Sequence, residues 1–192
     1  MGGSVKNHAS RREFLQAGLA LPAAGLVSAF KPEAALQLKS EIGAYRVLGN
    51  TGLKVSAVGS GVGITPDPAV IARAIELGVN YFDTARGYGE GNSERITGAA
   101  LRGKRSGVVL ASKTDARTRA DVIRDIDASL KALQTDYLDI WHLHSRDTPD
   151  TITDEAVEAC ELLKKQGKTR FIGVSAHDIN AVADTILKIG KF

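Results

Sequence analysis

Short apolar strands alternate with amphipathic helices along most of this chain, and this alternation is the feature that most constrains its fold. Strands are predicted at five places: 57–63, 80–84, 108–112, 137–144 and 170–175. Helices are predicted after each of them: 67–78, 93–101, 121–134, 154–166 and 179–189. Helices of this length between apolar strands predict right-handed βαβ units on a parallel sheet. We therefore expect five such units, preceded by a hairpin over residues 45–55.

Three of these helices carry particularly clear signals. Asp67 followed by Pro68 is typical of a helix start, and Gly78 is typical of a helix end. The helix over 121–134 shows an apolar stripe with helical spacing, formed by Ile123, Ile126, Leu130 and Leu133. The helix over 154–166 is expected to bury Ala156, Ala159, Cys160 and Leu163.

A parallel sheet of this kind is either doubly wound or closed as an eight-unit barrel. A doubly wound dinucleotide-binding fold calls for a G-x-G-x-x-G turn after its first strand. The glycine-rich stretch 59–63 reads GSGVG and lacks that spacing. Composition and periodicity by themselves leave both architectures open.

Composition excludes several classes of protein. The chain is 43% hydrophobic and 24% charged, with a formal net charge of +3, which is ordinary for a globular protein and excludes a disordered tail. No Lys/Arg-rich face with interleaved aromatic residues is present, so no nucleic-acid partner is expected. The single cysteine, Cys160, excludes a disulfide framework, and no apolar stretch predicts stable membrane insertion. His142, His144 and His177 have no acidic residue at a convincing metal-ligand spacing, so no metal site is predicted.

Polar residues gather at the ends of the predicted strands. Asp83, Lys113 and His144 end three successive strands, and Tyr88 lies in the glycine-rich loop that follows the first of them. Each has an ordinary structural explanation: a helix-capping carboxylate, a solvated lysine, a hydrogen-bonded histidine and an exposed aromatic residue. In a parallel barrel, however, the carboxyl ends of the strands converge on one face. Because these polar residues lie at the ends of successive strands, the sequence favours a proton-transfer site.

The chain from about Ala44 onward resembles the aldo-keto reductases. The resemblance rests on five stretches in the family's order: 45–55 (YRVLGNTGLKV), 78–89 (GVNYFDTARGYG), 111–114 (ASKT), 136–144 (DYLDIWHLH) and 167–175 (GKTRFIGVS). The resemblance implies a (β/α) barrel of the TIM type and NADPH-dependent reduction of a carbonyl compound, with NADH not excluded. It also implies a catalytic tetrad, which falls on Asp83, Tyr88, Lys113 and His144.

The chemistry of carbonyl reduction suits these four residue types. Hydride addition leaves negative charge on the carbonyl oxygen, so an acid must stand beside that oxygen. Tyr88 is the expected acid, and the ammonium group of Lys113 would make its proton easier to release. Asp83 would hold Lys113, and His144 would orient the carbonyl. His142 has the same strand parity as His144, so it should face the same side one step deeper.

The resemblance also implies positions that bind the cofactor. Ser175 matches the residue that hydrogen-bonds the nicotinamide carboxamide, and Ala176 follows it where asparagine is common. The backbone around Gly61 and Val62 should approach the nicotinamide ring. Asp83 is expected to belong to the cofactor-binding site as well as to the catalytic tetrad. Cys160 and Trp141 are expected to be packing residues.

Residues 1–38 are predicted to be an export signal and linker rather than part of the fold. Arg11 and Arg12, followed by Phe14 and Leu15, precede an uncharged run that reaches Phe30. This layout resembles a twin-arginine signal, which implies the twin-arginine export machinery as a partner and a periplasmic location. Without use of the signal the protein would stay in the cytoplasm.

The remaining barrel domain, residues 39–192, is shorter than the roughly 250 residues typical of an eight-unit barrel. By resemblance, the absent units carry loops that grip the adenosine phosphate of the cofactor. We therefore expect a truncated barrel that is either a carbonyl reductase or a catalytically inactive fragment acting by association.

Overall fold

The computed structural model describes residues 44–64 and 67–192. The chain divides into two compact units, Met1–Leu36 and Gln37–Phe192, and every described residue belongs to the second. The predicted export signal over 1–38 lies outside the described residues.

Five parallel strands form the central sheet, and each predicted strand corresponds to one of them. They are β3 (Ser60–Gly61), β4 (Tyr81–Asp83), β5 (Val109–Thr114), β6 (Leu138–Leu143) and β7 (Thr169–Val174). Their order in the sheet is the same as their order in the chain. A doubly wound sheet reverses its strand order at a switch point, whereas a (β/α) barrel does not. The strand order therefore indicates a partial barrel rather than a doubly wound sheet.

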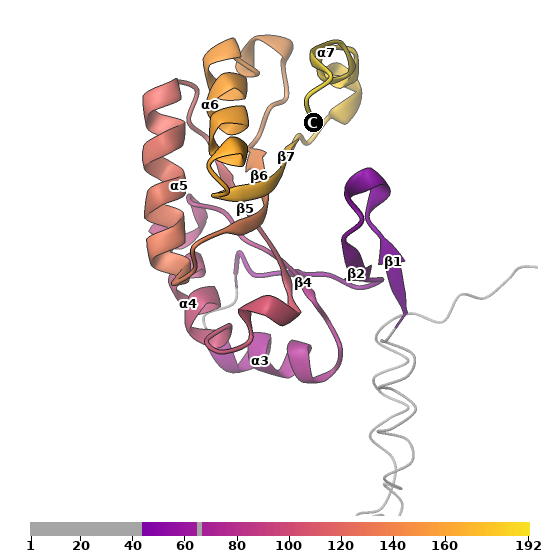
Figure 1. Ribbon diagram of the computed structural model, residues 1–192, viewed down its shortest axis with the longest axis vertical. Coiled ribbons are helices and arrows are strands. Elements are labelled where there is room, and N and C mark those ends of the chain that lie inside the picture. Colours follow the sequence, from indigo (N-terminus) through magenta and orange to yellow (C-terminus); the bar gives the residue numbers. More distant parts are fainter. Residues whose placement is uncertain (1–43, 65–66) are drawn as a thin grey trace, which may run out of the picture. The chain divides into compact units, whose positions relative to one another are not determined.

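Helices connect the strands on the outer side of the sheet (Figure 1). The connecting helices are α3 (Pro68–Glu76), α4 (Asn92–Ala100), α5 (Arg119–Leu133) and α6 (Asp154–Lys165); α7 (Ala183–Ile189) follows the last strand, β7. The predicted cap of α3 is confirmed, because the Asp67 carboxylate accepts a hydrogen bond from the Ala69 amide at 2.8 Å. The side chains of Thr118 and Thr153 cap α5 and α6 in the same way.

The two faces of the sheet bury different clusters. The outer face packs against the helices through large apolar side chains that include Phe82, Leu110, Trp141 and Ile172. The inner face carries a smaller cluster of Val109, Ala111 and Ile140. Leu53, from the antiparallel hairpin of β1 (Tyr45–Val47) and β2 (Lys54–Ser56), belongs to this inner cluster. The predicted hairpin is thus confirmed, and it covers the floor of the partial barrel.

Three predicted elements differ in detail from the structure. The strand over 57–63 is reduced to Ser60–Gly61, because this glycine-rich edge strand pairs only with β4. The buried face of α5 also differs from the predicted stripe: Ile126 and Leu133 are buried as expected, but Ile123 and Leu130 are only half-buried. Because α5 contacts both α4 and α6, its buried face is rotated relative to the predicted stripe and also includes Val122 and Ser129. The helix predicted over 179–189 is a 3₁₀ turn at Ile179–Ala181 followed by α7.

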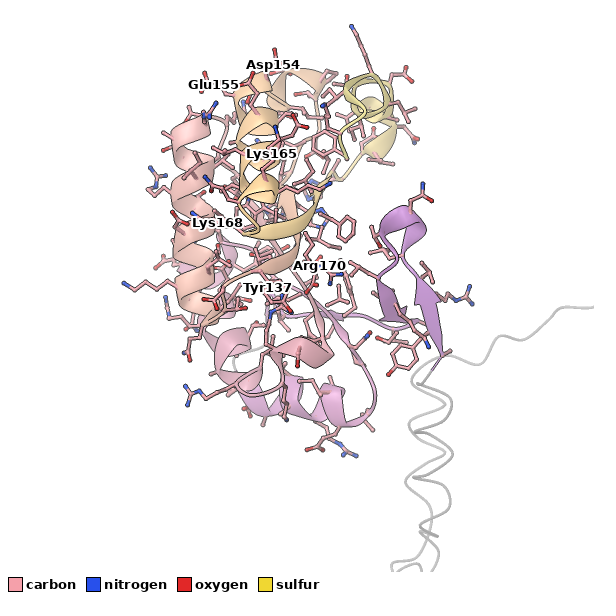
Figure 2. All side chains as sticks on the ribbon, in the orientation of Figure 1. Tyr137, Asp154, Glu155, Lys165, Lys168 and Arg170 are labelled. Atoms are coloured by element: carbon pink, nitrogen blue, oxygen red, sulfur yellow. The ribbon has the colours of Figure 1, made fainter. Side chains whose placement is uncertain are left out.

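Helix α6 shows how charge placement supports an element. Asp154 and Glu155 lie at its first turn, and Lys165 lies at its last turn, as Figure 2 shows. Acidic groups at the start and basic groups at the end both interact favourably with the helix dipole. The predicted apolar face of α6 is confirmed, since its four small or apolar residues are all buried.

Candidate functional site

The inward side chains of the sheet form layers that follow from the strand register. Asp83, Ala111, Ile140 and Phe171 are register partners across β4 to β7, and we call them the lower layer. Lys113, His142 and Gly173 are partners one step nearer the carboxyl ends of the strands, and we call them the upper layer. His144 and Ser175 follow directly beyond it. Polar groups therefore lie at the carboxyl end of the partial barrel and apolar groups at its floor.

The structure brings the four predicted catalytic residues together. Lys113 Nζ forms an ion pair with Asp83 Oδ1 and donates a hydrogen bond to the Thr84 carbonyl oxygen at 2.9 Å. The same Nζ lies 5.0 Å from the centroid of the Tyr88 ring. The Tyr88 and His144 rings meet edge-on, with their centroids 5.6 Å apart. Lys113 is buried, while the other three are half-buried and accessible from the carboxyl end of the sheet.

Close packing holds Tyr88 at this position. A Cβ atom added to Gly63 would lie 3.1 Å from Cδ2 of Tyr88, so the glycine allows the ring to approach the chain after β3. The Tyr88 hydroxyl makes no hydrogen bond to any described residue. That hydroxyl is therefore free to donate to a bound carbonyl oxygen. His144 Nδ1 lies 3.2 Å from Asp115 Oδ1, an ion-pair distance without hydrogen-bond geometry.

A buried polar network ties the ends of β3, β4 and β5 to α4. Glu94 has no solvent exposure; it accepts a hydrogen bond from Ser112 Oγ at 2.7 Å and forms an ion pair with Arg86. Ser93 Oγ donates to the Val62 carbonyl oxygen at 2.7 Å and lies 2.7 Å from Thr84 Oγ1. This network lies behind Asp83 and Lys113, so it fixes the strand ends that carry them.

The residues predicted to bind the cofactor differ in their exposure and in whether their polar groups are already hydrogen-bonded within the protein. Both backbone groups of Val62 are hydrogen-bonded within the protein: its amide donates to the Asp83 backbone carbonyl oxygen, and its carbonyl oxygen accepts from Ser93 Oγ. Gly61 is exposed, with open space where a side chain would be. The Ser175 hydroxyl has no partner in the described part of the chain, although its backbone pairs with Leu143 and Arg146. Ala176 is half-buried and packs against the hydrophobic core.

Other sequence predictions have structural outcomes as well. Cys160 is buried in the core, and burial raises the pKa of its thiol to about 12, as suits a packing residue. Trp141 is also fully buried. His177 is exposed, and its Nδ1 donates a hydrogen bond to Asp147 Oδ2 at 2.9 Å, which raises the pKa of His177. Residues 44–64 and 67–192 contain no group of His, Cys, Asp and Glu that could hold a metal ion, and no helix able to cross a membrane.

The pH dependence of stability should reveal the buried His142. Burial, the largest cause, lowers the pKa of His142 from 6.5 to about 4. Between these values an unfolded chain binds a proton that the folded chain does not, so stability falls as the pH decreases from 6.5 towards 4. The full contribution of such a shift is about 3 kcal/mol. Urea unfolding at pH 7 and pH 4.5 should show a smaller acid loss for His142→Gln than for the wild type; equal losses would contradict this prediction.

The sequence matches the aldo/keto reductase family over residues 67–190, which is more than half of the chain. The chain belongs to this family. It is 40% identical over 151 residues to "L-galactose dehydrogenase" of Arabidopsis thaliana, a match that covers 68% of this chain and 47% of that protein. The chain therefore spans about half the length of the curated relatives it matches.

Solved structures of aldo-keto reductases agree with this assignment. The holo form of aldo-keto reductase AKR11C1 from Bacillus halodurans has a TM-score of 0.68 at 35% identity, covering 75% of this chain and 53% of that one. An aldo/keto reductase from Klebsiella pneumoniae, in complex with NADP and acetate, has a TM-score of 0.65 at 35% identity, with 71% and 51% covered. The parallel sheet and its helices are thus those of the family's barrel.

Sequence reasoning did not single out three residues that shape the site. Glu94 is one of them, although a glutamate beside Ser93 on an otherwise small-residue helix face was a usable signal. Asp115, next to the strand end at Lys113, was a similar signal for the His144 contact. Arg146 is almost fully buried and donates to the Ala116 carbonyl oxygen at 2.5 Å, and its sequence context gave no sign of this.

Proposed function

We propose that this chain carries the proton-transfer site of a nicotinamide-dependent reductase that acts on an aldehyde or ketone. The observation that carries the proposal is the position of Lys113, ion-paired with Asp83 and 5.0 Å above the Tyr88 ring, with His144 against the edge of that ring. A buried, paired ammonium beside a phenol with a free hydroxyl is an arrangement suited to general acid catalysis.

The residues at the carboxyl end of the sheet fit a nicotinamide cofactor. Ser175 offers a hydroxyl without a protein partner, and Gly61 leaves open space in front of β3. Ser175 would hold the carboxamide group, and Gly61 would allow close packing of the ring. The bound cofactor would supply the hydride, which no amino-acid side chain can. The complexes of relatives with NADP support NADPH as the cofactor.

The side chains of this chain would supply the acid and the geometry. Tyr88 would donate its hydroxyl proton to the carbonyl oxygen as negative charge develops there. Lys113 would stabilise the resulting phenolate, and Asp83 would keep the ammonium in place and charged. His144, next to Asp115, would orient the carbonyl oxygen towards Tyr88.

A thermal melt of the full chain with and without NADPH tests the proposal. A ligand that binds only the folded state stabilises it by about 2.7 kcal/mol at one hundred times its dissociation constant. We expect a cooperative transition that NADPH moves upward, followed by carbonyl-dependent oxidation of NADPH. NADH in the same assay shows which cofactor is preferred.

A melt that NADPH does not move would contradict the proposal. Within the described residues, β3 and β7 each have a strand partner on one side only. Such open edges pair readily with other chains. Self-association without cofactor binding would therefore favour the alternative, a catalytically inactive fragment that acts by association.

A further inference from the structure

His142 occupies a central position in the upper layer. It is the register partner of Lys113 on one side and of Gly173 on the other. Neighbouring strands of a sheet are about 4.8 Å apart, so inward side chains at paired positions are adjacent. A Cβ atom on Gly173 would lie 2.7 Å from His142 Nδ1, so the glycine provides the space in which the imidazole ring lies.

Both ring nitrogens of His142 are buried and unpartnered. Nδ1 and Nε2 are each shielded from solvent, and neither forms a hydrogen bond of standard geometry within 44–64 and 67–192, although the Val174 backbone lies close enough to raise the pKa of the ring. An unsatisfied buried polar group is costly to a folded protein, and leucine would fill the same place without that cost. Packing alone therefore gives no reason for an imidazole at this position.

The charged groups around His142 come from the predicted catalytic site. Asp83 on β4, Lys113 on β5 and His144 just after β6 all act electrostatically on the ring, and β7 contributes no charged group, only Gly173 and the backbone of Val174. Burial keeps the ring neutral near pH 7, so it carries one nitrogen lone pair that can accept a proton donor.

The ammonium group of Lys113 has one N–H donor that is not used in a hydrogen bond to a described residue. The group has three N–H donors, and two of them are used, by Asp83 and by the Thr84 carbonyl oxygen. The described residues provide no third hydrogen bond to Nζ. A neutral ring beside it can accept this third donor without adding a charge that would compete with Asp83.

We propose that His142 is a positioning residue of the proton-transfer site: its neutral imidazole holds the ammonium group of Lys113 in the orientation that serves Tyr88. This inference rests on the proposed function. His142 acts through Lys113 and does not touch the substrate. Loss of the imidazole leaves the ammonium free to turn away from the phenol, so proton transfer slows while cofactor binding is unchanged.

Two substitutions separate positioning from packing. His142→Leu removes the acceptor but fills the space, and His142→Gln keeps an acceptor. We expect His142→Leu to lower kcat for carbonyl reduction by about tenfold and to alter the pH profile of kcat, with its melting temperature no lower than that of the wild type and its Kd for NADPH unchanged. His142→Gln should restore kcat to within about threefold of the wild type. His177→Gln, at an exposed histidine outside the site, is the matched control.

Equal kcat and equal pH profiles for wild type, His142→Leu and His142→Gln would overturn the proposal. A second measurement is independent of turnover, namely an NMR titration of the imidazole of His142, assigned by its absence in His142→Gln. Lys113→Met removes the neighbouring cation, so His142 should take up its proton at a higher pH.

An unchanged titration of His142 in Lys113→Met would contradict the contact between the two residues. The failure of the proposed function has a different signature: the wild type does not oxidise NADPH with any carbonyl compound, whatever the titration shows. The two failures are therefore distinguishable.

Discussion

Replacement of Tyr88 by phenylalanine is expected to lower the turnover of carbonyl reduction by about 10²–10⁴, the range that general acid catalysis supplies. The substitution removes only the hydroxyl, which makes no hydrogen bond to a described residue, and keeps the ring that packs against Gly63 and His144. Folding and NADPH affinity should therefore stay the same. Steady-state kinetics, together with a melt with and without NADPH, measure both effects.

Tyr137→Phe is the control for this substitution. Tyr137 is half-buried, and its ring lies 4.0 Å from the guanidinium carbon of Arg105, outside the catalytic group. Loss of its hydroxyl should leave turnover within experimental error. Wild-type turnover in Tyr88→Phe would remove Tyr88 from the role of acid, and an equal loss in both variants would indicate a general effect on the fold.

Replacement of Glu94 by alanine is expected to destabilise the protein by about 3–5 kcal/mol, the cost of breaking a buried ion pair by removing one partner. Glu94 is fully buried, whereas the side chain of Arg86 is 24% exposed. The substitution leaves the Arg86 cation without its counter-ion and Ser112 Oγ without its acceptor. It also opens a cavity under the ends of β4 and β5. Urea unfolding of wild type and variant measures the difference in free energy.

Glu76→Ala provides a matched control on the neighbouring helix. Glu76 pairs with Arg73 at 2.8 Å, but the two side chains are 58% and 66% exposed. Exposed ion pairs contribute about 0–1 kcal/mol, so this variant should unfold close to the wild type. If Glu94→Ala were as mild as Glu76→Ala, Glu94 could not be the residue that fixes the strand ends behind the site.

Much of the fold was accessible from local sequence signals. Asp67-Pro68 predicted the start of α3, and the buried face of α6 followed from its spacing, because capping and periodicity depend on nearby residues. The site was predictable for a related reason. Asp83, Lys113 and His144 end successive parallel strands, whose carboxyl ends must meet on one face.

The rest depends on contacts between distant elements. The periodicity of α5 did not specify that α4 and α6 would bury Val122 and Ser129, since the neighbours of a helix decide which part of its apolar side is covered. Glu94 and Arg146 are polar residues that a sequence pattern assigns to the surface. Partners from other segments allow their burial: Arg86 pairs with the charge of Glu94, and the Ala116 carbonyl oxygen accepts a hydrogen bond from Arg146.

The order of the strands has a consequence for how the site is assembled. Each strand pairs with the one just before it in the chain, so contacts join segments that are near each other in sequence. Such local topologies form faster than those that need distant segments to meet. Asp83, Tyr88, Lys113 and His144 all lie between the end of β4 and the residue that follows β6. We expect a chain emerging from the ribosome to bring these four side chains together once residue 144 is free, before β7 has left the ribosome.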